Sequence, residues 1–226
     1  MDKFFPFKKR FIHSYPVSRV HKSATLDWKA KVVCANCNNT WMSKIESKYA
    51  EPAMTPLILG HTGIPIAQSQ ADAIGRFAFK TAVVLDHLSR VRQPFFPRSI
   101  RHGFKNHPHA IPASVRMWLA GFARFEGGNS KTVYHEGELP TGQVVEFYVC
   151  TYSVGHLSFQ VVSMKSPFAP HMVFRPRDER FEFLAVPFWP WIPSGVVWPP
   201  ARVLETAADF DAFADRWRNL FIRPVE

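Results

Sequence analysis

The stretch Lys31-Val-Val-Cys-Ala-Asn-Cys-Asn-Asn-Thr-Trp-Met-Ser-Lys-Ile-Glu-Ser-Lys-Tyr-Ala-Glu-Pro52 joins a predicted strand, a cysteine pair and a predicted helix. Val32 and Val33 are typical of the end of a β-strand. Cys34 and Cys37 follow on a turn that can direct both sulfurs toward one point. Two thiolates at this spacing are half of a tetrahedral zinc site, so the stretch predicts a structural zinc ion.

A helix is predicted directly after the second cysteine. Asn38 is a favourable N-cap residue. Trp41, Ile45 and Tyr49 recur at four-residue spacing, which gives the helix one buried face. Pro52 is expected to end it, because proline disfavours helical geometry in the preceding residue. Strand, thiolate turn and helix in this order form the second half of a ββα-metal unit.

The motif Cys-x-x-Cys-Asn-x-x-Trp, formed by Cys34, Cys37, Asn38 and Trp41, resembles that of bacterial HNH-type endonucleases. In that family the motif is followed by a helix, as predicted here. The chain from residue 71 to residue 222 is similar to the same family in its pattern of helix, strands and closing Phe-Ala-x-Arg-Trp. The resemblance implies a metal-dependent endonuclease that acts on DNA.

The first half of the family pattern is incomplete in this chain. The family carries an earlier Cys-x-x-Cys and then an acidic residue and a histidine leading into a proline. Here no cysteine precedes Cys34, and Ile12 stands where the acid belongs, although His13 and Pro16 keep the spacing. The pattern predicts that the chain begins partway into the motif, as a truncated or degenerate copy.

The resemblance also implies roles for individual residues. His13 is the expected general base, and Asn38 takes the position of the last metal-binding or orienting side chain. The catalytic metal would be Mg²⁺ or another divalent cation, which neutralises charge on the scissile phosphate. Zinc on Cys34 and Cys37 needs two further ligands, and the options are His13, His21 or a partner chain, as in a homodimer.

Length and composition indicate a folded protein and limit the classes to which it can belong. The 226 residues are 46% hydrophobic and 15% aromatic, which suffices for a substantial core. No apolar run approaches the ~18 residues of a membrane span, and the N-terminus lacks the order of a secretory signal. We therefore expect a cytoplasmic protein without a membrane segment. Cys150 lies in an apolar run and is expected to be a buried core thiol.

The net charge of +10 is unevenly distributed. Residues 1–50 hold ten Lys and Arg against three Asp and Glu, and residues 75–110 hold seven against one. Cationic segments on a slightly acidic body favour a polyanionic ligand, with solubility alone as the alternative. The residues predicted to bind nucleic acid are Lys8, Lys9, Arg10, Arg76, Lys80, Arg98, Arg101 and Lys105.

The sequence predicts an α+β fold in two parts. Residues 1–52 form an incomplete ββα-metal-like unit, and residues 53–226 form an accessory domain with an antiparallel sheet flanked by helices. The predicted elements are a loop over 53–70, an amphipathic helix over 71–90, period-two strands between 115 and 186, and a helix over 206–221. Residues 106–109 are interpreted as a loop.

Three functions are compatible with these patterns. The first is an HNH-type endonuclease, and the second is a non-catalytic descendant that binds nucleic acid or a protein through its basic half. The third is a thiol redox protein, since a cytosolic Cys-x-x-Cys is often redox-active. The third is disfavoured because no βαβ pattern surrounds the pair.

Overall fold

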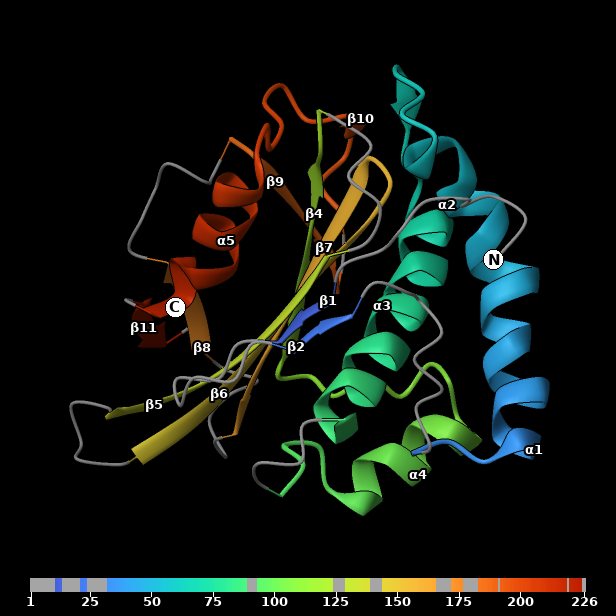
Figure 1. The fold of residues 1–226 in the computed structure, drawn as a ribbon, viewed down its shortest axis with the longest axis vertical. Helices are drawn as coiled ribbons and strands as arrows, with labels where there is room; N and C mark the ends of the chain where they lie inside the picture. Colours follow the sequence, from blue (N-terminus) through green and yellow to red (C-terminus); the bar gives the residue numbers. More distant parts are fainter. Residues whose placement is uncertain are drawn as a thin grey trace.

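The protein folds into three layers, with helices on both faces of one central sheet (Figure 1). Helices α1 to α4 cover one face of the sheet, and α5 covers the other. The α+β class and the antiparallel sheet flanked by helices are therefore as predicted from the sequence. The computed structural model describes residues 11–13, 21–23, 32–88, 93–123, 129–138, 144–165, 172–176, 183–190, 192–218 and 220–224.

The central sheet has five antiparallel strands in the order β5-β6-β7-β4-β9. A tight turn at Gly155, whose φ of 59° suits glycine, joins β6 to β7. The strands are β4 (Val115–Gly121), β5 (Ser130–Glu138), β6 (Val144–Val154), β7 (Leu157–Lys165) and β9 (Ala185–Trp189).

Period-two alternation gives this sheet two buried faces. On β7, Phe159 and Val161 point into the core beneath α3, whereas Val162 and Met164 point into a second core beneath α5. Because side chains alternate across a strand, a strand buried on both faces carries an almost continuous apolar run. The strand pattern predicted from 115 to 163 is confirmed.

The helical layer on this face contains α3 (Gln68–Leu88), the shorter α4 (Arg98–Asn106) and a helical segment over residues 35–58. That segment contains α1 (Ala35–Cys37), the π-helical turns η1 (Asn38–Met42) and η2 (Ile45–Ala50), and α2 (Glu51–Ile58). The predicted end at Pro52 is wrong. Pro52 lies in the first turn of α2, directly after the π turn η2, and proline is tolerated at that helix position.

The segment over 35–58 continues through the boundary predicted at residue 52. Its buried residues Ile45, Met54 and Leu57 share one core with α3 and the sheet. The predicted loop over 53–70 is therefore helix for its first part, followed by the short strand β3 (Ile64–Pro65), which pairs with β10 (Val197–Trp198).

The opposite face of the sheet is covered by α5 (Ala207–Asp215) and the 3₁₀ turn η5 (Arg216–Arg218). Thr206 caps α5 in a capping box with Asp209, whose pKa is lowered by hydrogen bonds from Thr206 and Glu205. Phe210, Phe213 and Trp217 are buried against the sheet. The predicted helix nevertheless stops early, because β11 (Leu220–Pro224) instead pairs with β8 (Met172–Pro176).

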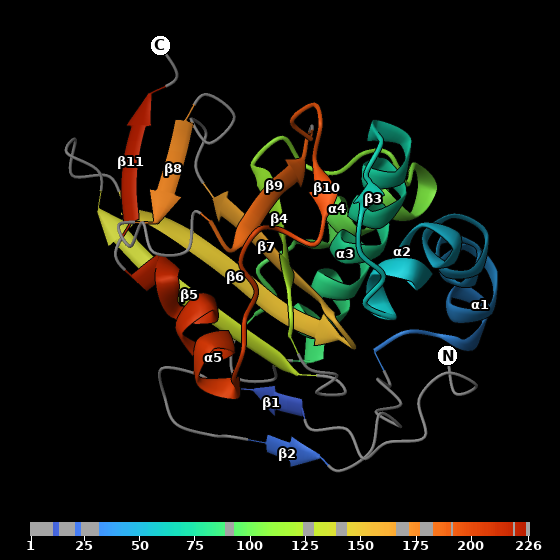
Figure 2. The ribbon, with the colours of Figure 1, turned by 90° about the horizontal axis from the view of Figure 1, so that it is seen from above.

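The N-terminal hairpin consists of β1 (Phe11–His13) and β2 (His21–Ser23). It lies beside β5 and apart from α1 in both ribbon views (Figures 1 and 2). A hairpin before the cysteines is therefore present, but the structure does not confirm a ββα unit in which it packs on the helix. None of the described helices, α3 included, has the unbroken apolar length needed to cross a bilayer.

Candidate nucleic-acid interface

A cavity of about 380 Å³ opens where the start of the helical segment 35–58 meets α3 and α4 (Arg98–Asn106). We call it the basic cavity, because among the described residues its lining includes lysines, arginines and histidines but no carboxylate. The lining residues are Val32, Val33, Cys34, Cys37, Trp41, Met42, Lys80, Val83, Val84, His87, Arg98, Arg101, His102, Phe104 and Lys105.

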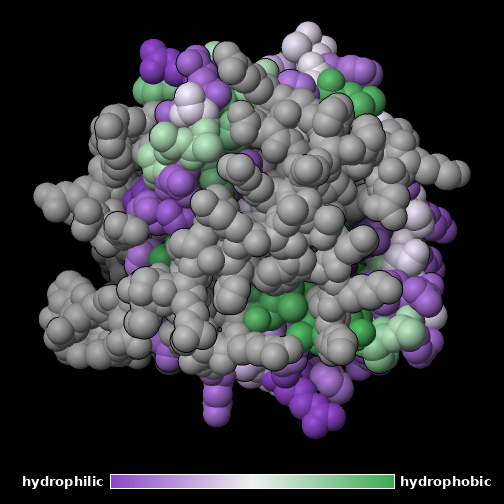
Figure 3. Space-filling model, in the orientation of Figure 1, coloured by the Kyte–Doolittle hydropathy of each residue, from purple (hydrophilic) through white to green (hydrophobic). Residues whose placement is uncertain are grey.

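Helix α4 supplies most of the charge of the basic cavity. Arg98, Arg101, His102 and Lys105 have the spacing i, i+3, i+4 and i+7, which places them on one face of a helix. Phe104 is buried and attaches α4 to α3 through an edge-to-face contact with Phe79 at 4.9 Å. In Figure 3, hydrophilic side chains gather at the lower edge, where α4 lies in Figure 1, with apolar side chains above them.

The buried carboxylate of Asp86 fixes the loop that leads into α4. Asp86 is fully buried near the end of α3 and accepts hydrogen bonds from the Phe95 and Phe96 amides at 2.9 and 3.0 Å. It also accepts one from the Tyr134 hydroxyl at 2.6 Å. These three donors satisfy the carboxylate, so the fold can hold a buried charge there. Helix α4 begins at Arg98, two residues after the Phe96 amide that Asp86 binds.

Two arginine–histidine contacts order the basic cavity. Arg101 Nη1 donates to His87 Nδ1 at 2.9 Å, and Arg98 Nε donates to His102 Nε2 at 3.3 Å. Burial, and then the charge of Arg101, lower the pKa of His87 below its ordinary value. Because arginine can only donate, the histidine nitrogen is the acceptor in each contact.

The cysteine pair lies at the edge of the basic cavity. Cys34 is exposed, and its Sγ accepts a hydrogen bond from the Cys37 amide at 3.3 Å. This bond is the main reason that the pKa of Cys34 is lowered, and Lys105 adds to the effect. The Cys34 sulfur therefore lies against the backbone of Cys37, across the turn predicted for this pair. Among the described residues, however, no group of three or more His, Cys, Asp or Glu side chains could hold a metal ion.

The zinc ligands beyond the cysteines stay a prediction. His13 and His21 are directly paired across the β1–β2 hairpin, but their side chains lie outside the described residues. The described residues supply two thiols, which is half of a four-ligand zinc site.

Lys80, one of the residues predicted to bind nucleic acid, is buried and is not an outward-facing cation of α3. It is 6% exposed, and its ammonium forms an ion pair with Glu46 and lies 4.8 Å from the centre of the Phe77 ring. Burial lowers its pKa, and Glu46 partly offsets that effect. Its charge is therefore neutralised within the helical layer.

The other predicted contact residues lie elsewhere. Arg76 is on α3 outside the basic cavity, with its guanidinium 5.8 Å from the centre of the Tyr49 ring. Asn38 is exposed and donates to Asn39 Oδ1 at 3.4 Å. Lys8, Lys9 and Arg10 lie outside the described residues.

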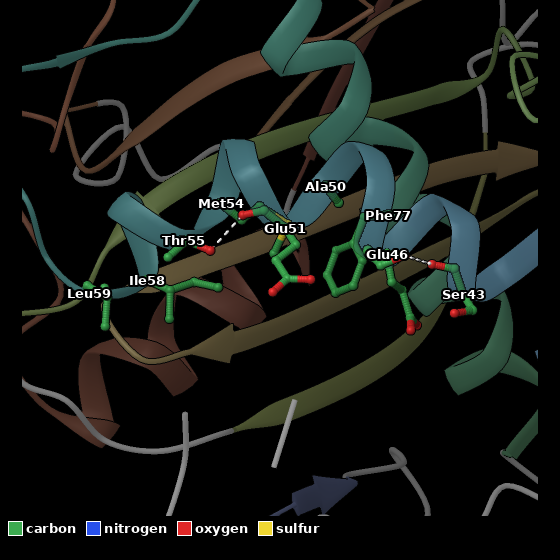
Figure 4. A pocket seen from close by; sticks show the side chains of 10 residues that line it. Ser43, Glu46, Ala50, Glu51, Met54, Thr55, Ile58, Leu59 and Phe77 are labelled. Carbon is green, nitrogen blue, oxygen red and sulfur yellow. Dashed lines mark hydrogen bonds between the residues drawn. The ribbon is translucent and has the colours of Figure 1, made fainter. Parts of the chain in front are cut away.

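A second cavity, of about 260 Å³, lies on the same helical segment and has the opposite charge. We call it the acidic cavity. Figure 4 shows the carboxylates of Glu46 and Glu51 on either side of the Phe77 ring, with Met54 and Ile58 farther along the wall. Thr55 Oγ1 donates to the Glu51 carbonyl at 2.7 Å. No cationic side chain of the described residues lines this cavity, so it does not suit a polyanion.

Trp41 belongs to the motif quoted from the sequence, but the sequence did not predict that it lines one cavity with His87 and His102, nor that residues 98–106 form a helix. The basic residues Arg98, Arg101, His102 and Lys105 recur at intervals of three and four, a pattern that is typical of one face of a helix. No family model, curated protein or solved structure matches this chain.

Proposed function

We propose that this protein is an HNH-nuclease-like DNA-binding protein that holds DNA phosphates at the basic cavity. The observation that carries the proposal is the convergence of Arg98, Arg101 and Lys105 at one cavity with no carboxylate among its described lining. Arginine and lysine that neutralise phosphates release counterions, which gives affinity without sequence preference. The cysteine motif beside these cations is the one that resembles the nuclease family.

Two features support phosphate binding over simple solubility. Arg98 and Arg101 are held by His102 and His87, so less side-chain entropy is lost when a phosphate binds. In addition, α4 is fixed by the Asp86 anchor, which keeps the cations on one face. A surface that served solubility alone would need neither restraint.

The test compares two triple variants with the same net charge. The site variant carries Arg98→Gln, Arg101→Gln and Lys105→Gln. The control carries Lys44→Gln, Lys48→Gln and Arg202→Gln, which are exposed and outside the basic cavity. We expect the site variant to lose at least tenfold in DNA affinity, and its slope of log K against log salt to fall by about 2 to 3.

The control should keep most of the affinity, because its residues do not converge. Equal losses in both variants, measured by fluorescence anisotropy across a salt series, would show that net charge alone drives binding and would refute the proposed site.

Metal-dependent DNA hydrolysis is a second candidate function. It is supported by the family motif at Cys34 and Cys37 and by the hairpin that pairs His13 with His21 upstream of it. In this candidate His13 removes a proton from the attacking water, and a divalent cation supplies charge stabilisation at the phosphate. Nicking of supercoiled plasmid in Mg²⁺ or Mn²⁺ that disappears in His13→Ala is the expected result. Intact plasmid at saturating binding would exclude it.

A further inference from the structure

The basic cavity has an apolar wall that phosphate binding does not require. Val33, Trp41, Val83 and Val84 line it on the side of the helical segment 35–58 and α3, whereas the exposed cations come from α4. A duplex backbone presents phosphates on an open face and needs no apolar recess. The volume of about 380 Å³ also falls in the ~300–1,000 Å³ range of small-ligand pockets.

Trp41 offers an unused hydrogen-bond donor beside this wall. Its Nε1 is enclosed and has no hydrogen-bond partner in the described part of the chain. The indole ring itself is partly exposed and meets Phe104 edge to face at 5.8 Å. A buried tryptophan N–H usually has an acceptor. Because the partly exposed Trp41 ring lines the basic cavity, a shift of the ring can present this N–H to a ligand that brings an acceptor.

We propose that the basic cavity receives one unpaired nucleotide of single-stranded DNA. The base packs on the apolar wall with an acceptor toward Trp41 Nε1, and the adjoining phosphates lie at Arg98, Arg101 and Lys105. This inference rests on the proposed function and names the form of DNA that the site prefers. A base within a duplex is stacked and paired, so it cannot enter without the cost of unpairing.

The arrangement of charge supports a nucleotide over a bare phosphate. The wall and the cations lie on different elements, so a ligand that uses both must be apolar at one end and anionic at the other. A nucleotide has this shape, and stacking on apolar or aromatic side chains is indifferent to which base is present. The site would therefore prefer single strands with little sequence specificity.

The experiment measures affinities for three fluorescent ligands of equal length: a single-stranded 12-mer, its duplex, and an abasic strand with the same phosphates. We expect the single strand to bind at least about tenfold more tightly than the abasic strand, since each stacked base adds affinity. The single strand should also bind more tightly than the duplex.

Trp41→Phe keeps a ring and removes the N–H donor. It should weaken binding of the single strand by about three- to tenfold and leave the abasic strand unchanged. Trp118→Phe is the matched control, because Trp118 packs against Trp217 on the other face of the sheet. Circular dichroism confirms that both variants fold.

Equal affinities for the single strand and the abasic strand would overturn the nucleotide proposal while leaving phosphate binding intact. Tighter binding of the duplex would overturn it in the same way. Absence of binding to all three ligands would refute the proposed function as well, so the two failures are distinguishable.

Discussion

The basic and acidic cavities border the same helical segment, yet they have opposite charge. Both touch α3, and one ion pair joins them, since Lys80 lines the basic cavity and Glu46 lines the acidic one. The basic cavity gains its exposed cations from α4, an element that does not reach the acidic cavity. The exposed positive charge that distinguishes the basic cavity is therefore supplied by one short helix, α4.

The presence of a cavity therefore does not identify a phosphate-binding site, because the charge of the lining residues decides which ligand fits. The acidic cavity has an apolar wall like that of the basic cavity, but Glu46 and Glu51 would repel a phosphate. The basic cavity combines an apolar wall with arginines that are already ordered by histidines.

The largest expected effect is a difference in reaction rate between thiols. Cys34 and Cys37 at the basic cavity are accessible to a reagent, whereas Cys150 is buried in the core. Cys34 is exposed with a lowered pKa, whereas burial raises the pKa of Cys150 to about 12. In metal-free native protein, Ellman's reagent should modify two thiols rapidly and the third about a thousandfold more slowly, because Cys150 reacts only after unfolding.

Cys150→Ala provides the control, since it should remove the slow phase alone. Adding zinc before the reagent should protect both fast thiols if they are zinc ligands, and EDTA should restore their reactivity. Fast modification of all three native thiols would contradict the burial of Cys150.

Asp86→Ala should remove the anchor that creates the basic cavity. It leaves the Phe95 and Phe96 amides and the Tyr134 hydroxyl without their acceptor. We expect the free energy of unfolding to fall by about 3 kcal/mol or more, measured by urea denaturation. Asp72→Ala is the control, because among the described residues that partly exposed carboxylate accepts from Gln68 alone, on its own helix. It should cost less than about 0.5 kcal/mol. Similar losses in both variants would refute the anchor.

Removing either partner of the Lys80–Glu46 ion pair should change the free energy of unfolding by different amounts. The Lys80 side chain is 7% exposed and the Glu46 side chain is 42% exposed. Glu46→Gln leaves a buried cation unpaired and should cost about 1–2 kcal/mol, less than the ~3–5 kcal/mol of a fully buried pair. Lys80→Met leaves only a hydrated carboxylate and should be neutral or stabilising. Chemical denaturation of both variants gives the comparison, and a larger loss for Lys80→Met would contradict it.

The smallest effect should be a pH dependence from His87. Its folded pKa lies below its ordinary value of 6.5, so between the two values the unfolded chain binds more protons. The stability contributed by neutral His87 is therefore present above pH 6.5 and is lost as the pH falls toward the folded pKa. His87→Gln should make the fall in urea midpoint between pH 7.5 and 5 shallower.

Arg101→Gln should reduce the same slope in part, because Arg101 is the second cause of the lowered pKa of His87. Unchanged slopes in both variants would show that His87 is not responsible.

Local patterns predicted much of the fold. The three- and four-residue spacing around Ile74, Phe77 and Leu85 predicted α3, and these residues are buried. Alternation predicted the strands of the sheet, because period two follows from strand geometry alone. Spacing also placed Cys34 beside Cys37, since residues three apart meet across one turn.

Other features depended on contacts distant in sequence. The helical segment continues past Pro52, where Met54 and Leu57 are buried in the core shared with α3 and the sheet. Lys80 is buried because Glu46, on another helix, neutralises it. The predicted helix to residue 221 stops where β8 offers a strand partner. In each case tertiary packing outweighed a local preference.

The sequence by itself determined the α+β class, the cysteine turn and the excess of positive charge, because these depend on composition and on neighbours a few residues apart. Only the tertiary structure decided that Arg98, Arg101 and Lys105 face Cys34, Cys37 and Trp41 across one cavity. These residues meet because Asp86, near the end of α3, binds the loop before α4, and because the buried Phe104 attaches α4 to Phe79 of α3.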